Sequence, residues 1–385
     1  MGMRIGLLCH RGVGGSAMVA VGLARQLAAR GHEVHVVARA APPGLTPPPP
    51  GVTLHCLREE DDGVTTGLDV DWTPAQLRQL ADRLTTVVRD HDLQVVHFHY
   101  AVPFAWVVLD AIRRLGAARP AVVGTLHGTD VSVFGRRHGV RRRLAPALAC
   151  LDAVTTVSQH HAALAARVFG LSQLPDVIPN YVDLDRFTPR ELPAAGTRPR
   201  IVHISNFRPV KEPESMARIA DRVLATSPAE LWLVGDGEMM PEVETILDAR
   251  IAQGLVRRFG VRLDVESILP LTDLLLVSSR MESFCLVALE GMASGVPVAA
   301  PRIGGLPELV EHGVSGLLYE RGDEEGATRL ILDYLGSREL QATLRAGALA
   351  RARTLSTDVV IPRYEQMYRE LTGVAASADD VAVGG

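Results

Sequence analysis

Hydrophobic positions along the first half of the chain alternate between short continuous runs and longer runs with helical spacing. Residues 3–9 (MRIGLLC) predict a strand, residues 16–31 (SAMVAVGLARQLAARG) a helix that ends at its glycine, and residues 33–39 (EVHVVAR) a second strand. Further predicted strands are VTLHCL, VVHFH, AVVGTLH and AVTTVS, with helices near 73–90, 103–116 and 139–150. This alternation predicts an α/β fold with a parallel, doubly wound sheet.

The second half of the chain repeats the pattern after a break. Residues 179–200 are rich in proline and polar residues, and a new strand begins at residue 201 with IVHIS. LWLVG, LLLVSS and VPVAA predict further strands, so a second Rossmann-like domain follows. The expected domains are 1–183, a linker 184–200, 201–355, a C-terminal helix 356–373 that packs back toward the first domain, and a disordered tail 374–385.

Composition narrows the class of partner. The chain has 385 residues, net charge -4 and 47% hydrophobic residues, which fits two cores and gives no global signal for nucleic acid or an anionic membrane. The sequence contains no run of 18 apolar residues, so we expect no stable membrane insertion and a cytoplasmic protein. Four cysteines without paired or metal-like spacing are expected to be buried, reduced thiols: Cys9, Cys56, Cys150 and Cys285.

The loop after the first strand, HRGVGGSA, is glycine-rich. Gly12, Gly14 and Ala17 match a loose dinucleotide fingerprint, but the second strand ends without the acidic residue that would hold a ribose. NAD binding is therefore disfavoured. Gly14 and Gly15 still allow backbone amides to approach a phosphate, and Ser16 could cap the following helix. A plain strand-to-helix turn is the alternative.

Two loops of the second domain carry candidate chemistry. ISNFRPVKEPE follows a strand and contains Arg208 and Lys211, the only lysine in the chain. A single lysine among many arginines suggests a point charge at a diphosphate, although an exposed surface lysine is the alternative. LVGDGEM places Gly235 and Gly237 after another strand, where they fit either a ligand approach or a simple turn.

The segment SRMESFCLVALEGMASGVPV has two carboxylates in an apolar setting. Ser283 is predicted to cap a helix over 286–294, which places Glu282 in the preceding loop and Glu290 on the helix. Amides near residues 284–286 would form a positive helix start that suits a diphosphate, and the carboxylates could accept hydrogen bonds from hydroxyls on either side. This pattern indicates a nucleotide sugar. The alternative is an exposed Glu282 with Glu290 in a surface salt bridge.

Polar residues also follow strands of the first domain. His97 and His99 alternate onto one side of a buried strand, and without accompanying cysteines they do not predict a metal site. His127 follows the next strand, where it could face the cleft and bind a sugar hydroxyl or could be a packed core residue. The basic run 136–143 is either a solvated helix face or a surface that attracts an anionic acceptor.

Together these residues resemble the retaining GT-B glycosyltransferases of family 4. The resemblance runs from GVGGS through TVSQHH, VIPNYVDLDRF, SNFRPVK, LVGDGE and ESFCLVALEGMASGVPV to GGLPELVEHGVSGLL. It implies the GT-B fold, two Rossmann-like domains with parallel sheets that face each other across a deep cleft. Cys285 stands where glycine is usual in this family, and Gly291 where alanine is usual.

The resemblance also implies substrates. The subgroup that HYAVPFAW, TLHGTDVSVFG and HISNFRPVK resemble most uses UDP-N-acetylglucosamine as donor and L-malate as acceptor, in the first step of bacillithiol biosynthesis. No metal or cofactor is implied, and a homodimer is left open. The alternatives are another acceptor (inositol phosphate or a lipid), a UDP-N-acetylglucosamine 2-epimerase, or a non-catalytic sugar-nucleotide-binding protein.

The resemblance assigns a role to each candidate residue. The catalytic residues would be His127, Arg208, Lys211 and Glu282. The donor would be bound by Gly14, Gly15, Ser16, Arg208, Lys211, Gly235, Glu282, Ser283, Phe284, Cys285, Leu286 and Glu290. The acceptor would be bound by Ser16, Tyr100, Thr125, Asn180 and Arg143. Two cations and a helix start would stabilise the charge on leaving UDP, and a front-face reaction would need no side-chain nucleophile.

Overall fold

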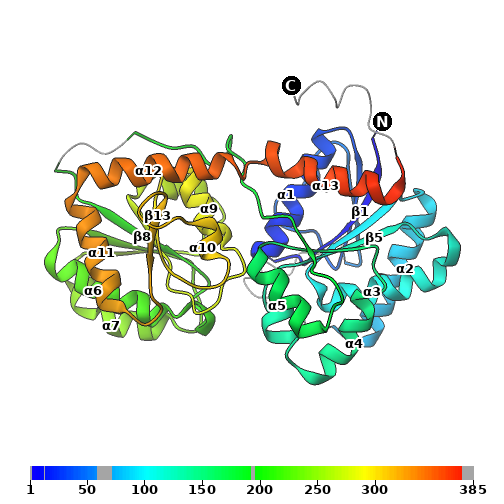
Figure 1. The fold of residues 1–385 in the computed structure, drawn as a ribbon, viewed down its shortest axis with the longest axis horizontal. Coiled ribbons are helices and arrows are strands. Elements are labelled where there is room, and N and C mark those ends of the chain that lie inside the picture. The colour runs from blue at the N-terminus through cyan, green and yellow to red at the C-terminus, as the bar shows by residue number, and fades with distance from the viewer. Residues whose placement is uncertain (1, 13, 59–71, 192–195, 375–385) are drawn as a thin grey trace. The chain divides into compact units, whose positions relative to one another are not determined.

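The computed structural model describes residues 2–12, 14–58, 72–191 and 196–374. By its internal contacts the chain forms two compact units, the first made of residues 1–179 with 358–385 and the second of residues 180–357. Each unit contains one parallel sheet with helices on both faces (Figure 1). The expected linker 184–200 is grouped with the second unit. The predicted tail lies outside the described residues from position 375 onward.

The first unit has a seven-stranded sheet in the order β3-β2-β1-β4-β5-β6-β7. Its strands are β1 Arg4–Leu8, β2 Glu33–Ala38, β3 Val52–Cys56, β4 Val95–His99, β5 Ala121–Leu126, β6 Ala153–Thr156 and β7 Asp176–Val177. Its helices are α1 Gly15–Ala29, α2 Pro74–Asp90, α3 Ala101–Leu115, α4 His138–Leu148, α5 Gln159–Phe169 and α13 Thr357–Thr372. A short π-helical turn, Asp130–Phe134, follows β5.

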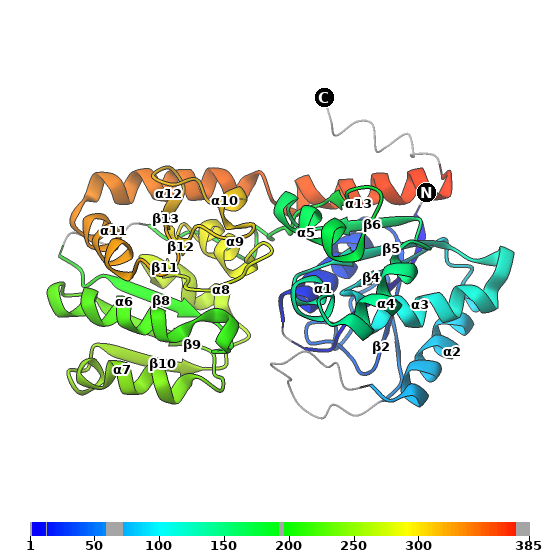
Figure 2. The same cartoon turned by 60° about the horizontal axis from the view of Figure 1, so that its bottom comes forward.

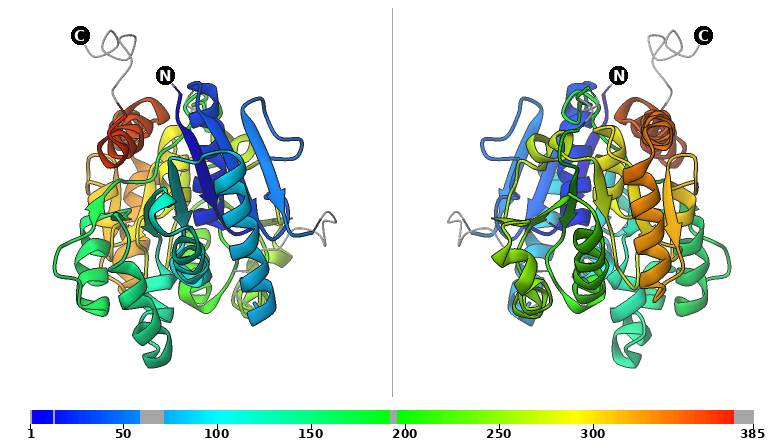
Figure 3. Two further views of the ribbon diagram at one scale, coloured as in Figure 1. Left: turned by 90° about the vertical axis from the view of Figure 1, so that its right-hand side faces the viewer. Right: turned by 90° about the vertical axis from the view of Figure 1, so that its left-hand side faces the viewer.

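The core of the first unit lies between the sheet and the layer of α2, α3 and α4. Side chains such as Leu84, Phe104 and Leu144 from these helices pack with Phe98 of β4 in one apolar cluster. Helix α13, red in Figure 3, is joined to β4 by a hydrogen bond of 2.6 Å between the Tyr368 hydroxyl and a histidine ring of that strand. The chain's last helix is therefore part of the first unit.

The second unit has a six-stranded sheet in the order β10-β9-β8-β11-β12-β13. Its strands are β8 Arg200–Ile204, β9 Glu230–Val234, β10 Val256–Gly260, β11 Leu274–Leu276, β12 Val298–Pro301 and β13 Gly316–Tyr319. Its helices are α6 Pro213–Thr226, α7 Met240–Ala252, α8 Val265–Ile268, α9 Leu286–Ala293, α10 Leu306–Leu309, α11 Glu324–Gly336 and α12 Arg338–Arg353. Helices α6 and α7 lie on one face of the sheet (Figure 2), and α9 packs against α12.

Strand order reverses once in each sheet, and this reversal positions the candidate residues. Consecutive strands leave β1 in opposite directions in the first unit and leave β8 in opposite directions in the second. In doubly wound sheets the loops at such a reversal open a crevice at the carboxyl ends of the strands. The predicted class, two Rossmann-like units with parallel sheets, is confirmed.

Two details differ from, or limit, the expectations drawn from composition. Cys9 and Cys285 are buried as expected and Cys56 is half-buried, but Cys150 is exposed. It lies just beyond the end of α4, so it does not face the core. Among the residues that the structure describes, no helix is long and apolar enough to cross a membrane.

Candidate functional site

A lysine–glutamate pair occupies the strand reversal of the second unit. Lys211 ends a short 3-10 turn, Pro209–Lys211, after β8, and Glu282 lies in the loop between β11 and α9. The Lys211 Nζ donates to Glu282 Oε1 at 2.6 Å, and the Ser279 hydroxyl donates to the same oxygen at 2.7 Å. Two loops that are distant in sequence therefore meet at one charged pair.

The charge state of Lys211 follows from its neighbours. Burial is the largest single influence and disfavours the ammonium, but the attraction of Glu282, the effect of Cys285 and the hydrogen bond to Glu282 together outweigh it, and the pKa of Lys211 is raised above its usual value. Arg208 lies close enough to oppose this rise in pKa by like-charge repulsion. Arg208 and Lys211 thus offer two positive charges against a single carboxylate, an arrangement that can accept an additional anion.

Backbone contacts hold the two loops in register. The Ser278 hydroxyl donates to the Lys211 carbonyl at 2.7 Å, and the Gly305 amide donates to the Glu282 carbonyl at 3.0 Å. A Cβ atom on Gly304 would lie 1.9 Å from that same carbonyl oxygen. Gly304 therefore has to be glycine if Glu282 is to keep this position.

The glycines after β9 have a similar explanation. Gly235 has φ +111, and a Cβ there would lie 1.8 Å from the Ser205 carbonyl oxygen. A Cβ on Gly237 would lie 2.1 Å from the Asn206 carbonyl oxygen. The need for glycine at both positions follows from the close packing of the β8 and β9 loops. The role of Gly235 in donor binding stays a prediction.

Glu290 is a half-buried carboxylate on α9. Burial raises its pKa to about 8, against the opposing effect of Arg186 and with a further raising effect of Glu266. Arg186 pairs with Glu266 at 2.9 Å, whereas Glu290 forms no ion pair with any residue that the structure describes. The alternative of a surface salt bridge at Glu290 is therefore wrong. Neither Arg186 nor Glu266 was a candidate from the sequence, because neither belongs to a glycine-rich loop or a capped helix.

The start of α9 differs from the prediction. The residue before the helix is Cys285, with φ 80 and ψ 77, and no side chain caps the helix. The helix begins at Leu286, as predicted, but the expectation that Ser283 caps it is wrong, because the N-cap position is Cys285, two residues later. Left-handed backbone is strained for any residue with a Cβ, so glycine would suit this position better than cysteine. Phe284 and Cys285 are both buried, and burial raises the pKa of the thiol.

In the first unit, the start of α1 is open. The helix begins at Gly15 with Gly14 before it, so Ser16 lies inside the first turn and the prediction that it caps the helix is wrong. Both glycines are exposed, and a Cβ on either would meet nothing within 4 Å. Packing against neighbours therefore does not require glycine at either position. The empty surroundings leave space beside the positive end of the helix.

The histidines of β4 form an internal network. His97 and His99 lie fully buried on one side of the strand, as predicted, with ring centroids 4.3 Å apart. The Thr125 hydroxyl bonds His97 Nε2 at 2.7 Å and the Thr155 hydroxyl at 2.6 Å. Thr125 is 0% exposed, so the structure does not offer this side chain to an acceptor. It positions His97 instead.

His127 lies next to this network. Its Nε2 is 3.0 Å from His99 Nδ1, and its backbone amide donates to the carboxylate of Asp130. His127 is only 8% exposed, which favours the packed alternative over the open one, and its role in sugar binding stays a prediction. Burial, and then the neighbouring His99, hold the pKa of His127 well below its usual value. His127 is therefore a neutral hydrogen-bonding group at pH 7.

The other acceptor candidates differ in accessibility. Tyr100 has φ 83, and its hydroxyl lies 2.6 Å from the Thr129 hydroxyl. Arg143 is exposed, with its guanidinium 4.4 Å from the ring centre of Trp106. Asn180 belongs to the second unit and is buried, and its Oδ1 has no hydrogen-bond partner among the described residues.

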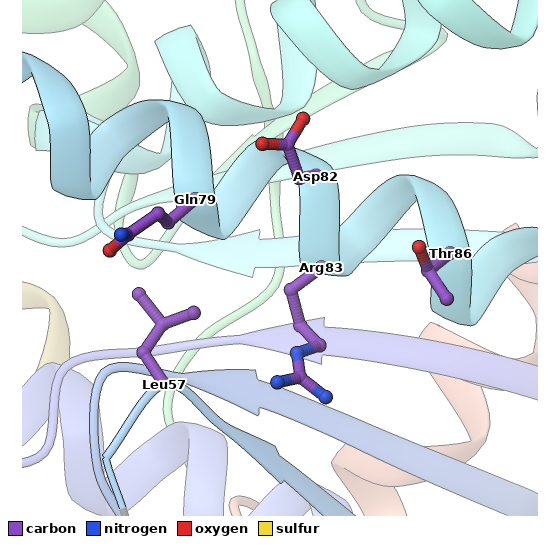
Figure 4. A pocket seen from close by; sticks show the side chains of 5 residues that line it. All are labelled: Leu57, Gln79, Asp82, Arg83 and Thr86. Atoms are coloured by element: carbon purple, nitrogen blue, oxygen red, sulfur yellow. The ribbon is translucent and has the colours of Figure 1, made fainter.

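One surface hollow lies away from all these residues. It is lined by Leu57 and by four side chains of α2, with Arg83 extending toward the strands (Figure 4). None of the candidates from the sequence belongs to it.

Comparisons with known proteins connect the fold and the site to one class. Residues 13–186 match the model of Glycosyltransferase Family 4, and residues 198–337 match that of Glycosyl transferases group 1. The chain is 31% identical to N-acetyl-alpha-D-glucosaminyl L-malate synthase of Bacillus anthracis, over 96% of this chain and 98% of the relative. It is 30% identical to D-inositol 3-phosphate glycosyltransferase of Geodermatophilus obscurus, over 97% and 88%.

Solved structures show the same architecture. HepE of Anabaena in complex with UDP and glucose matches with a TM-score of 0.77 at 21% identity, over 97% of this chain and 100% of that one. Sucrose-phosphate synthase from Thermosynechococcus elongatus matches with a TM-score of 0.77 at 20% identity, over the same shares. The fold is GT-B, and the protein is a glycosyltransferase. The chain belongs to glycosyltransferase family 4.

Proposed function

We propose that the protein transfers N-acetylglucosamine from UDP-N-acetylglucosamine to L-malate with retention of the α configuration and releases UDP. The observation that carries the proposal is the Lys211–Glu282 pair at the strand reversal, with Arg208 beside it and Glu290 half-buried on the next helix. The Bacillus anthracis relative, whose name specifies these products, supports the choice of substrates. The reaction would be the first step of bacillithiol biosynthesis in the cytoplasm.

Donor binding divides among the charged groups of the second unit. Arg208 and Lys211 neutralise the diphosphate, because both are cationic and only one carboxylate opposes them. Glu282 accepts hydrogen bonds from the sugar hydroxyls with the oxygen that Lys211 and Ser279 leave free. Glu290 accepts from the ribose hydroxyls. Backbone amides of Phe284, Cys285 and Leu286 complete the phosphate site in this unit. The remaining donor-binding candidates are Gly14, Gly15, Ser16, Gly235 and Ser283.

The reaction follows from where charge develops. As the glycosidic bond breaks, negative charge grows on the UDP oxygen, and the cations beside it stabilise that charge without a metal ion or cofactor. A leaving phosphate oxygen takes the proton of the acceptor hydroxyl on the same face of the sugar, so the configuration is retained. A covalent glycosyl-enzyme would need a free carboxylate nucleophile. That carboxylate would have to lie on the face of the sugar opposite UDP, and Glu282 is poorly suited to the role because it is paired with Lys211, which is proposed to bind the diphosphate.

The acceptor is proposed to bind to side chains of the first unit, and Asn180 stays a separate candidate from the sequence. Arg143 is exposed, and its guanidinium is held over Trp106, so it can attract a malate carboxylate. Tyr100 and Ser16 supply hydroxyls, and neutral His127 supplies a hydrogen bond to the donor sugar. A second candidate acceptor is D-inositol 3-phosphate, which the 30% identical relative favours by its name.

An acceptor panel tests the proposal. The purified chain is incubated with UDP-N-acetylglucosamine and L-malate, D-malate or D-inositol 3-phosphate, and UDP release is measured together with the mass of the product. We expect UDP release and a glycosylated product with L-malate. If UDP is released only with D-inositol 3-phosphate, that compound and not L-malate is the acceptor. Appearance of an epimeric sugar nucleotide without any acceptor would indicate an epimerase. Tight UDP binding without turnover of any acceptor would indicate a non-catalytic binding protein.

A further inference from the structure

Three histidines of the first unit meet away from the residues discussed so far. His35 lies on β2, His55 on β3 and His91 directly after α2. One ring nitrogen from each lies within 4.8 Å of those of the other two. In the sheet order, β1 and β4 separate this cluster from β5 and the His127 loop.

Strand register explains how the cluster forms. His55 pairs with Val37 in the parallel β2–β3 ladder, and His35 lies two residues earlier on β2, so the two histidines project from the same face of the sheet. Val37 packs into the core beneath α2 and α3. His91 ends α2, and its ring centre lies 4.1 Å from that of His35. Strands β2 and β3 and the end of α2 therefore bring three imidazoles together.

Hydrogen bonds determine which ring nitrogens of the cluster have a lone pair available for a metal ion. His35 Nε2 lies 3.0 Å from the Glu33 carboxylate, so this nitrogen carries the proton and Nδ1 keeps its lone pair. A carboxylate that orients an imidazole in this way is the usual second partner of a metal-binding histidine. Nδ1 of His35 lies 2.9 Å from His55 Nε2, and the His91 ring has no hydrogen bond from the described residues.

We propose that His35, His55 and His91 bind a divalent cation of the zinc class. Zinc–imidazole bonds of about 2.0–2.1 Å place tetrahedral ligand nitrogens about 3.3 Å apart, which the cluster reaches with small rotations of its rings. Imidazole ligands suit Zn²⁺, Ni²⁺ or Cu²⁺ and not Mg²⁺. The ion would join β2, β3 and α2, and water would fill a fourth position.

The surroundings of His35 and His55 favour the neutral ring that metal binding requires. Burial lowers the pKa of His35 and, together with the neighbouring imidazoles and Arg83, lowers the pKa of His55 to about 4. Arg83, which also lines the hollow in Figure 4, is the cation that opposes a metal ion here, and Glu33 is the carboxylate that favours it.

Zinc titration of the full chain tests the site. The protein is stripped with a chelator, and binding of Zn²⁺ alone is measured by calorimetry. The variants are His55→Gln, His91→Asn and their combination, with His138→Gln as a control because that histidine is exposed on α4. Far-ultraviolet circular dichroism without zinc establishes that each variant is folded.

We expect one zinc ion per wild-type chain, affinity at least tenfold weaker in each single variant and no binding at this site in the double variant. The control should bind as wild type does, and zinc should raise the melting temperature of wild type and control alone. If wild type binds no zinc, or if the double variant binds it with wild-type affinity, the site does not exist. Neither result depends on glycosyl transfer, so the test is separate from that of the proposed function.

Discussion

Replacing Glu290 by glutamine should make the second unit more stable at pH 8 and weaken its binding of UDP. In the folded protein the pKa of Glu290 is displaced from 4.5 to about 8, mainly by burial. A folded-state pKa above the unfolded one means that the contribution of this group to stability is fully present below pH 4.5. It is lost progressively as pH rises toward 8. The neutral amide of Glu290→Gln cannot ionise, so the variant escapes that loss.

The size of the effect follows from the displacement of the pKa. It corresponds to about 4–5 kcal/mol for a carboxyl group sealed from water, and because Glu290 is only half-buried we expect about 2–3 kcal/mol. The free energy of unfolding of Glu290→Gln, relative to wild type, should therefore be about 2–3 kcal/mol larger at pH 8 than at pH 5. Above pH 8, where the Glu290 carboxyl is ionised, UDP should bind about 10–100-fold more weakly to Glu290→Gln, because the ribose hydroxyls lose a charged acceptor.

Tryptophan fluorescence can report this unit alone. Trp72, Trp106 and Trp232 are the three tryptophans, and only Trp232 lies in the second unit. Urea unfolding of a Trp72→Phe, Trp106→Phe background at the two pH values then measures the stability of that unit. The control is Glu320→Gln, whose side chain is 73% exposed. An equal stability difference at pH 5 and pH 8 would refute the reasoning.

Three further predictions concern single contacts. Lys211→Ala should lower kcat/KM for UDP release by about 10²–10³-fold, and unchanged turnover would remove Lys211 from the mechanism. Gly304→Ala should cost about 2 kcal/mol or more in urea unfolding and weaken UDP binding, because its Cβ would displace Glu282. Gly313→Ala, also at positive φ but with open space around it, should cost less and leave UDP affinity intact; equal effects would contradict the clash. Tyr368→Phe should cost about 1–3 kcal/mol, because a buried imidazole of β4 loses its partner; a wild-type melting temperature would contradict this.

The fold could be predicted because its signals are local. Short β-branched runs that are buried on both faces alternate with helices, and the break before Ile201 marks the second sheet. Lys211 and Glu282 are 71 positions apart. From the sequence we could predict that they lie near each other but not that they form a direct hydrogen bond. Each residue follows a strand, and the carboxyl ends of parallel strands share one edge. The 2.6 Å bond between them depends on loop packing at Gly304, which no local pattern reveals.

The helix caps and the histidine cluster could not be predicted from local sequence patterns. Ser16 and Ser283 have the right side chains for caps, but the N-cap positions are taken by Gly14 and Cys285, and neither helix has a side-chain cap. The histidine cluster escapes pattern analysis because strand register and the end of a helix bring its members together.

The burial of His127 has a similar cause. Its position after a strand allowed either an open or a packed side chain. In the structure Asp130 accepts from its backbone amide, and its ring lies beside the neighbouring histidine. The sequence could place this residue at the edge of the sheet and could not give the direction of its side chain.

Anomeric analysis of the product tests the central account most directly. The purified chain is incubated with UDP-N-acetylglucosamine and L-malate, the product is analysed by proton NMR, and Lys211→Ala and Glu320→Gln serve as the active-site and surface variants. The account predicts α-linked N-acetylglucosaminyl malate from wild type and Glu320→Gln, and at least 100-fold slower formation by Lys211→Ala. A β-linked product, or full activity without Lys211, would contradict it.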